Sequence, residues 1–173
     1  LNFSQLLCLF FSFDQLIIHD YNRVVEILNE ITPSRLLAEI SKYCTIEYRS
    51  KAFRPKKKRQ MSLYLNKEWY ALTWTKKIFN AFDNPKLILD STLVNDLILT
   101  KILGFEDVRS DKRITYIEGT KNTDGIRDAC IKNENRIGIG LYPVSKKEFK
   151  TLSDKGIMLP PKSTWFEPRM KNG

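Results

Sequence analysis

The sequence predicts an α+β fold with a mixed, largely antiparallel sheet and three to four helices. The first half of the chain is dominated by short apolar strand patterns, and the last third alternates helix and strand signals. Hydrophobic residues make up 42% of the 173 residues and charged residues 28%, which is typical of a globular protein and excludes a disordered one. A chain of this length buries one ordinary core, so we expect a single domain over residues 1–173.

The first third of the chain predicts two strands, a helix and a third strand. Residues 5–11 and 15–20 are apolar and rich in Phe, Leu and Ile, as buried strands are. A helix follows, because Thr32 is a favourable N-cap and Pro33 suits the first helical position. Its apolar side chains recur at helical spacing, at Leu36, Leu37, Ile40, Tyr43 and Cys44. The segment "TIEYR" is then predicted to be a strand.

The middle of the chain predicts a β-hairpin and a second helix. Two strand patterns, "MSLYL" and "WYALTWT", flank the short turn "NKE". The helix is expected from about residue 91 to residue 103, because an apolar stripe recurs there at helical spacing. Asp90 or Ser91 caps this helix, and Gly104 ends it.

The last third of the chain alternates strands and helices. "RITYIEG" and "RIGIGLY" are predicted strands, and a short helix over 122–131 separates them. Ser145 and Glu148 form a capping box that opens a further helix, which stops before Gly156. The final segment, 157–173, is expected to be an extended tail punctuated by prolines.

Positive charge is concentrated in one loop, residues 49–59. The net charge of the chain is +9, and this loop supplies +7 without a single acid, so that +2 remains elsewhere. The cations are Arg49, Lys51, Arg54, Lys56, Lys57, Lys58 and Arg59. With Phe53 among them, the last five of these residues are suited to contact a nucleic acid or an acidic surface. A solvated, mobile connector explains the same composition.

Cysteine and histidine usage narrows the chemistry. Cys8, Cys44 and Cys130 are far apart and odd in number, which favours buried thiols in a reducing compartment, so we expect a cytoplasmic protein. His19 is the only histidine, so neither a structural zinc site nor a histidine-based nucleophilic triad is supported. The N-terminal segment lacks the features of a signal peptide, and polar residues interrupt it too early for a bilayer span. We expect no membrane partner.

The tail motif "PPKSTWFEP" (160–168) is the first candidate binding motif. Its two prolines fix two φ angles and make a stiff approach. Lys162 could then present its ammonium to a phosphate, while Ser163 and Thr164 offer hydroxyl and backbone N–H donors. Alternatively, the prolines carry the chain across the surface and the aromatic residues fill a gap in the core. No glycine-rich loop precedes a helix here, which weakens the phosphate interpretation.

A second candidate motif is "EDVRSDKR", in which charges alternate at every second residue. In an extended segment Asp107, Arg109, Asp111 and Arg113 would all lie on one face. The two acids could hold a magnesium ion while the two arginines grip a phosphate. Mutual salt bridges within a loop explain the same pattern.

A third candidate is "DYNR", which follows the predicted strand 15–20. Asp20, Asn22 and Arg23 lie beside His19 at the end of that strand, and strand ends commonly carry polar binding groups. Arg23 is therefore a further candidate for anion binding. A helix cap combined with an ion pair is the alternative explanation.

Three stretches carry a resemblance to a known family. "LGFEDVRSDKRITYIEG", "MLPPKSTWFEPRMKNG" and "DQLIIHDYNRVV" closely resemble the uncharacterised bacterial and archaeal family catalogued as domain of unknown function 1015. Members of that family are longer, so the resemblance implies that this chain is a C-terminal half and that its own N-terminal half is a partner. That half carries a "D-G-H-H-R" element similar to the ParB and sulfiredoxin-like superfamily, which includes free-serine kinases. The present chain contains no such string.

The resemblance leads to one main hypothesis and two alternatives. By analogy with that superfamily, the whole protein would be a small-molecule phosphotransferase or nucleotide-using enzyme, with magnesium accompanying the nucleotide. This chain would contribute to a shared cleft, with Lys162 and Arg109 as anion contacts and Asp107 or Asp111 near the metal. The alternatives are a nucleic-acid-binding module that uses residues 49–59 and an interaction domain without chemistry of its own.

Overall fold

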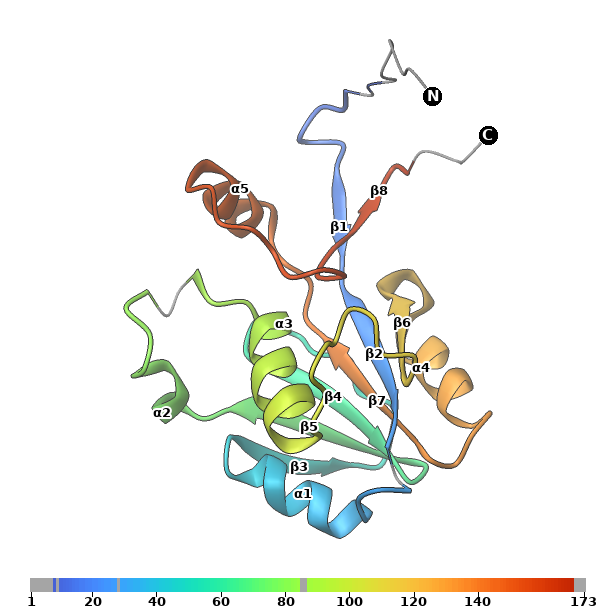
Figure 1. Cartoon of the computed structure of the whole chain (residues 1–173). Helices are drawn as coiled ribbons and strands as arrows, with labels where there is room; N and C mark the ends of the chain where they lie inside the picture. Colours follow the sequence, from blue (N-terminus) through green and yellow to red (C-terminus); the bar gives the residue numbers. More distant parts are fainter. Residues whose placement is uncertain (1–7, 9, 28, 85–86, 170–173) are drawn as a thin grey trace, which may run out of the picture.

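A six-stranded sheet forms the centre of the molecule, as the computed structural model shows (Figure 1). The structure describes the chain except for residues 1–7, 9, 28, 85–86 and 170–173. The strand order is β3-β5-β4-β7-β2-β6, and every neighbouring pair is antiparallel. The strands are β2 (Tyr21–Glu26), β3 (Cys44–Arg49), β4 (Gln60–Leu65), β5 (Glu68–Trp74), β6 (Ile114–Glu118) and β7 (Arg136–Leu141). The predicted α+β class is confirmed.

The hairpin predicted around "NKE" joins β4 to β5. Leu65 pairs with Glu68, so Asn66 and Lys67 form the turn, with φ angles of +50° and +65°. Two central residues at positive φ match the right-handed twist of the flanking strands, which favours this turn in hairpins. The register then places apolar side chains of both strands opposite one another in the core.

Two helical segments cover one face of the sheet (Figure 1). α1 (Pro33–Ser41) begins as predicted, because the Thr32 hydroxyl accepts a hydrogen bond from the backbone N–H of Arg35 and Pro33 takes the first helical position. Its buried side chains, Leu36 and Ile40, pack in the main core beneath the sheet. The apolar side chains that recur at helical spacing in the sequence therefore face the sheet.

The second covering element is α3 (Asp90–Leu93), which continues as a π-helical segment, η2 (Val94–Ile102). The backbone N–H of Leu103 donates to the carbonyl of Ile98, five residues back, at 3.0 Å. The cap predicted at Asp90 or Ser91 is wrong: Leu89 is the N-cap residue and gives no side-chain cap. Asp90 instead uses its carboxylate to hold residue Arg59, as described below.

α4 (Asn122–Cys130) covers the opposite face and contacts β7, β2, β4 and β6. It approaches the sheet closely because Gly138 on β7 has no side chain. A Cβ atom there would overlap Ile126 Cγ2 and lie 3.1 Å from Cys130 Sγ. Glycine at this position thus permits the close backbone approach that the glycines of "RIGIGLY" suggest.

A two-stranded arm extends from one end of the sheet (Figure 1). Its strands are β1 (Ile17–His19) and β8 (Trp165–Glu167), which pair antiparallel, and we call this pair the arm. α5 (Lys146–Asp154) packs beside it through a small apolar cluster of its own. The predicted capping box opens α5, since the Ser145 side chain accepts from the Glu148 backbone and the Glu148 side chain reaches back.

Three details differ from the sequence prediction. The described residues contain five α-helices, including a short α2 (Lys76–Phe79) that no periodicity announces, and also η2 and a 3₁₀ turn, η3 (Gly119–Lys121). The strand expected over 5–11 falls mostly outside the described residues, and its last two residues, 10 and 11, are not in a strand. The tail is extended but also supplies β8. Within the described part of the chain, no helix is long and apolar enough to cross a membrane.

Candidate anion-binding site

The arm brings the tail motif against the start of β2. His19 pairs with Trp165, and His19 Nε2 lies 2.9 Å from Glu167 Oε2. Because only Asp20 separates β1 from β2, this pairing carries the tail over Tyr21. The rings of Tyr21 and Trp165 pack edge to face, with centroids 5.6 Å apart.

The tail makes a sharp turn before it enters β8. Ser163 is buried, and its hydroxyl donates to the carbonyl of Pro160 at 2.6 Å and lies 3.0 Å from Ser91 Oγ in α3. Lys162 adopts a φ of +56°, a left-handed conformation that is uncommon for a residue with a side chain. Consequently the Ser163 hydroxyl holds the tail to α3, while Lys162 is exposed and Thr164 is half-buried.

A hollow of about 360 Å³ lies beside this turn, and we call it the arm hollow. It is lined by Tyr21, Lys162, Thr164, Trp165, Phe166, Pro168 and Arg169. Lys162 Nζ lies 5.3 Å from the Tyr21 ring centroid, and Arg169 Cζ lies 4.0 Å from the Trp165 ring centroid. Each cation is thus held on an aromatic face.

None of the described residues that line the arm hollow carries a carboxylate. By contrast, Glu148 lines the hollow beside the basic loop and Glu134 lines the hollow at the end of the β4–β5 hairpin, both described below. Two cationic groups, one hydroxyl and aromatic walls form a site suited to a small anion with an apolar body.

Glu118 lies at the end of β6, close enough to Arg169 for their opposite charges to interact. Lys121 Nζ lies 2.8 Å from Glu118 Oε1, and this hydrogen-bonded pair lowers the pKa of Glu118, with a smaller contribution from Arg169. Glu118 is therefore shared between Lys121 and Arg169, and it offsets part of the positive charge at the arm hollow.

Arg23 lies on the same side of β2 as Tyr21, since the two residues are two positions apart on one strand. Its Nη1 donates to the Tyr21 carbonyl at 2.6 Å, and its Nη2 donates to Asn95 Oδ1 at 3.4 Å. Its Cζ lies 5.6 Å from the Tyr116 ring centroid. Burial lowers the pKa of Arg23 to about 10. The structure therefore places this predicted anion-binding residue next to Tyr21 but out of contact with solvent.

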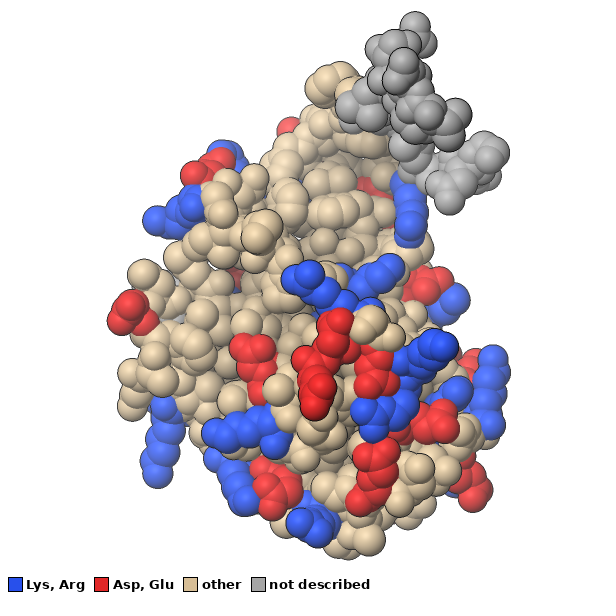
Figure 2. Space-filling model, in the orientation of Figure 1, with Lys and Arg blue, Asp and Glu red and all other residues tan. Residues whose placement is uncertain are grey.

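The basic loop 49–59 is tied to the rest of the fold by its own charges. Four of its seven cations form ion pairs: Arg49 with Glu47, Arg54 with Asp20, Lys58 with Glu148, and Arg59 with Asp90. Lys51, Lys56 and Lys57 have no acidic partner among the described residues. Figure 2 likewise shows acids and bases intermixed over the lower part of the face it presents. Much of the charge concentrated in the sequence is thus compensated in space.

The pair formed by Arg59 and Asp90 is the most buried of these. Asp90 Oδ2 accepts from the Arg59 backbone N–H at 2.8 Å, and Asp90 Oδ1 accepts from its guanidinium at 3.2 Å. Burial raises the pKa of Asp90, and the hydrogen bonds from Arg59 oppose that rise. The loop is therefore anchored to the first turn of α3.

A second, wider hollow of about 690 Å³ lies beside this loop, and we call it the loop groove. It is lined by Lys57, Lys58, Arg59, Thr73, Trp74, Lys76, Phe79 and Glu148. Arg59 Cζ lies 4.2 Å from the Phe79 ring centroid. Lys57, Lys58 and Arg59, three of the five cations considered for nucleic-acid binding, lie together at this groove. Arg54 does not line the groove and forms an ion pair with Asp20 instead.

The segment 106–113 forms turns instead of an extended strand, so its four charges do not share one face. Asp107 accepts from the Arg109 backbone N–H at 2.9 Å and from a serine hydroxyl, and Asp111 accepts from the Arg113 guanidinium at 2.8 Å and 3.1 Å. Arg113 also pairs with Glu30 at 2.9 Å. These hydrogen bonds lower the pKa of both aspartates.

The magnesium contact predicted for Asp107 or Asp111 stays a prediction. The oxygens of Asp107 and Asp111 are already occupied by donors within the loop. Nor does the described part of the chain contain a group of three or more His, Cys, Asp or Glu residues placed to hold a metal ion. Arg109, Arg113 and the two aspartates are not among the residues that line the arm hollow.

The remaining polar residues of "DYNR" have structural partners. Asn22 Oδ1 accepts from the backbone N–H of Leu141 at 2.9 Å, and Asp20 Oδ1 accepts from Arg54 at 3.0 Å. Both side chains are buried on strands or at their junction. They join neighbouring elements, so that Tyr21 is the residue of this motif that lines the arm hollow, with Arg23 bonded to its carbonyl.

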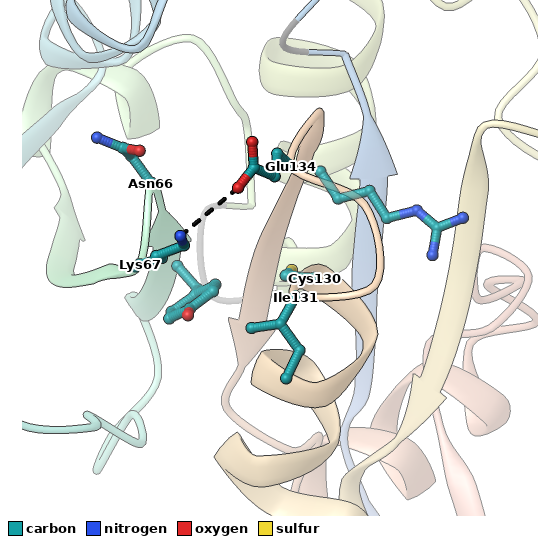
Figure 3. Close-up of a pocket in the computed structure, with 7 residues that line it drawn as sticks. Asn66, Lys67, Cys130, Ile131 and Glu134 are labelled. Carbon is teal, nitrogen blue, oxygen red and sulfur yellow. Dashed lines mark ion pairs between the residues drawn. The ribbon is translucent and has the colours of Figure 1, made fainter.

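A small hollow at the end of the β4–β5 hairpin contains Cys130 (Figure 3). Lys67 and Glu134 bridge its mouth with a 3.5 Å ion pair, and Ile131 and Asn66 lie to either side. Burial raises the pKa of the Cys130 thiol to about 12, so the thiol is protonated and a poor nucleophile at neutral pH. This hollow offers no chemistry comparable to that of the arm hollow.

Two residues of the arm hollow escaped the sequence prediction. Arg169 follows the tail motif directly. Its closeness in sequence to Trp165 and Phe166 could have indicated a cation held on an aromatic ring. Tyr21 carried no such signal, because its part in the site depends on the pairing of β1 with β8, whose residues lie about 150 positions apart.

Comparison with known proteins agrees with the family resemblance at the N-terminal side of the chain. The family model described as "Protein of unknown function (DUF1015)" matches residues 2–100, so the tail motif lies beyond the matched segment. No curated protein matches the chain. A conserved hypothetical protein from Pyrococcus furiosus is a structural neighbour at 15% identity and a TM-score of 0.45. The alignment covers 88% of this chain and 56% of that one, so this chain spans little more than half of that protein's length.

Proposed function

We propose that this chain, which belongs to the family of proteins of unknown function DUF1015, binds the phosphoryl group of a small anionic ligand in the arm hollow. The observation that carries the proposal is the convergence of Lys162 and Arg169 on one hollow whose described lining contains no carboxylate. Charged donors strengthen hydrogen bonds to phosphate oxygens, and Thr164 adds a hydroxyl beside them. The Tyr21 and Trp165 rings supply walls for an apolar or aromatic body of the ligand.

In the complete family protein this site serves a phosphotransferase or another nucleotide-using enzyme, and this chain supplies substrate contacts to a cleft shared with the rest of that protein. The support for the reaction class is the superfamily analogy, together with the phosphate-suited chemistry of the arm hollow. We assign no catalytic residue within this chain. Cys44 and Cys130 are buried free thiols, as predicted, whereas Cys8 is an exposed one, and the two buried thiols support the proposal of a reducing, cytoplasmic location.

The test is a titration of the purified chain with ADP, with adenosine and with inorganic pyrophosphate. We expect ADP and pyrophosphate to bind and adenosine to bind far more weakly, because adenosine lacks the phosphates. Lys162→Ala and Arg169→Ala should each weaken ADP binding roughly tenfold, since each removes a charged hydrogen bond.

Lys132→Ala is the matched control, because it removes one exposed lysine beyond the end of α4, outside the arm hollow. It should leave the affinity for ADP unchanged. The proposal fails if wild-type protein binds adenosine and ADP equally, or if the control weakens ADP binding as much as the two variants in the hollow.

A second candidate function is nucleic-acid binding in the loop groove. Its support is the gathering of Lys57, Lys58, Arg59 and Lys76 around the half-buried ring of Phe79, since cations beside an aromatic ring suit the backbone and bases of a single strand. Affinity for a single-stranded oligonucleotide should then fall steeply with salt. Replacing Lys57 and Lys76 by alanine should reduce the slope of log K against log salt by roughly 0.7 per lysine. An unchanged slope counts against this function.

A third candidate is an interaction surface for the remainder of the family protein. Large apolar side chains are exposed near the arm, among them Phe10 and Met158, which are more than nine-tenths exposed. Figure 2 shows that the surface toward this end of the molecule carries few charges. If the rest of the family protein covers this surface, Met158→Asp should weaken association of the two parts, and unaltered association would exclude it.

A further inference from the structure

Arg23 is a cation in the protein interior, and it has no anionic partner in the part of the chain that the structure describes. The residue is fully buried, and its contacts are a backbone carbonyl, the Asn95 amide oxygen and the face of the Tyr116 ring. Its Nε has no hydrogen-bond partner among the described residues. None of the ion pairs in the described part of the chain includes Arg23.

Such an arrangement is costly for stability. Buried charges are normally paired with an opposite charge, because an unpaired ion loses its hydration without compensation. The lowered pKa of Arg23 reflects this loss, yet at about 10 it still leaves the guanidinium charged at neutral pH. A polar or apolar residue would satisfy the same packing at lower cost.

The position of the charge connects it with the arm hollow. Arg23 donates to the carbonyl of Tyr21, whose ring lines the hollow, and the rings of Tyr21 and Tyr116 pack edge to face at 6.0 Å. Lys162 lies on the other side of that contact, 5.3 Å from the Tyr21 ring centroid. The hollow therefore has two cations at its surface and a third behind its wall.

We propose that Arg23 is a specificity-determining residue that makes the arm hollow prefer a doubly charged phosphate monoester over singly charged ligands of the same shape. This inference rests on the proposed function, because it concerns the same hollow. Arg23 does not touch the ligand. It acts through space, across the Tyr21 wall, as a fixed positive charge in a poorly solvated environment.

The size of the effect follows from Coulomb attraction. For a separation on the order of 10 Å and an effective dielectric constant of about 20, one unit charge changes affinity roughly tenfold for each negative charge on the ligand. The attraction raises the affinity of a monoanion by this factor, and it raises the affinity of a dianion by the square of this factor. Arg23 thus contributes roughly tenfold to the preference for the dianion.

The experiment compares phenyl phosphate with methyl phenyl phosphate at pH 8. The monoester carries close to two negative charges at this pH and the diester carries one, while both present the same ring and phosphoryl group. We measure the two dissociation constants by fluorescence or NMR titration for the wild type and for Arg23→Met. The monoester preference should fall roughly tenfold in Arg23→Met.

Asn95→Asp tests the same idea without removing Arg23. It places a carboxylate where Arg23 Nη2 already finds the Asn95 oxygen, so it neutralises the interior charge in place. The monoester preference should fall as in Arg23→Met, while the free energy of unfolding is maintained or increased. This variant also keeps the proposal testable if Arg23→Met does not fold.

The outcomes separate the two proposals. If the wild type binds the monoester, Lys162→Ala weakens that binding, and Asn95→Asp leaves the monoester preference unchanged, the specificity role of Arg23 is wrong while the arm hollow remains a phosphate site. If the wild type binds neither ester, both the proposed function and this inference are overturned. A fall in affinity for both esters by the same factor assigns Arg23 a purely structural role and also overturns the inference.

Discussion

Replacing Lys162 by glycine and by alanine separates what its backbone does from what its charge does. Lys162 has a φ of +56°, and a left-handed conformation costs a non-glycine residue about 1–2 kcal/mol. Glycine relieves that cost but loses about 0.5–1 kcal/mol through its greater freedom in the unfolded chain. The difference leaves Lys162→Gly about 1 kcal/mol more stable than Lys162→Ala.

The side chain contributes a separate amount. Its ammonium lies 5.3 Å from the Tyr21 ring centroid, a contact worth about 0.5–1 kcal/mol at an exposed site. Lys162→Ala loses this contact and keeps the backbone cost, so it should be about 0.5–1 kcal/mol less stable than the wild type. Lys162→Gly should lie close to the wild type. Both variants lack the ammonium and should lose ADP affinity equally.

Urea denaturation gives the free energies of unfolding, and ADP titration gives the affinities. Lys67 is the matched control, because it has a φ of +65° in the β4–β5 turn, away from the arm hollow. Lys67→Gly should also exceed Lys67→Ala in stability by about 1 kcal/mol, with ADP affinity unchanged. If Lys162→Ala is as stable as Lys162→Gly, or if Lys162→Gly still binds ADP like the wild type, the reasoning is refuted.

Three further predictions concern the scaffold. Gly138→Ala should destabilise the protein by about 1–3 kcal/mol, because the new methyl group overlaps Ile126. The double variant that also carries Ile126→Ala should lose less stability than the sum of the two single changes. Strict additivity of the unfolding free energies in urea denaturation would refute the overlap. Hydrogen bonds from Arg113 hold the pKa of Asp111 below its unfolded value, so the stability that Asp111 contributes is present above about pH 4 and lost as pH falls toward its folded pKa. Asp111→Asn should therefore differ from the wild type at pH 7 and match it near pH 2; a constant difference across this range would contradict that account. Ser145→Ala should lower stability by about 1 kcal/mol through loss of the α5 cap, whereas an unchanged unfolding midpoint would show that α5 does not unfold with the core.

Several elements were predictable because their determinants are local. Thr32 and Pro33 start α1, and Ser145 and Glu148 start α5, through contacts within four residues. The hairpin follows from two strand patterns on either side of a short turn. Where a pattern was absent or ambiguous the prediction failed. The short α2 has too few residues for a helical period, and the Asp90 carboxylate is used for a distant arginine instead of a helix cap.

The candidate site was predictable only in part. Lys162 and Thr164 could be selected from the tail motif, because lysine and hydroxyl residues after two prolines suit a phosphate. Arg109 and Arg113 were selected on the premise of an extended segment, and the turns of 106–113 remove that premise. Nothing in the local sequence indicated that Ser163 would turn inward to Ser91.

The sequence by itself determined the family, the α+β class, the capped helices and the uneven distribution of charge. Each of these properties depends on composition or on residues that are close together along the chain. Only the tertiary structure decided which charges remain uncompensated. It paired four cations of the basic loop with acids from other elements, and it joined β1 to β8 so that Tyr21, Lys162 and Arg169 surround one hollow. The physical reason is that electrostatic compensation depends on distance in space, and strand pairing over about 150 residues is set by the packing of the whole fold.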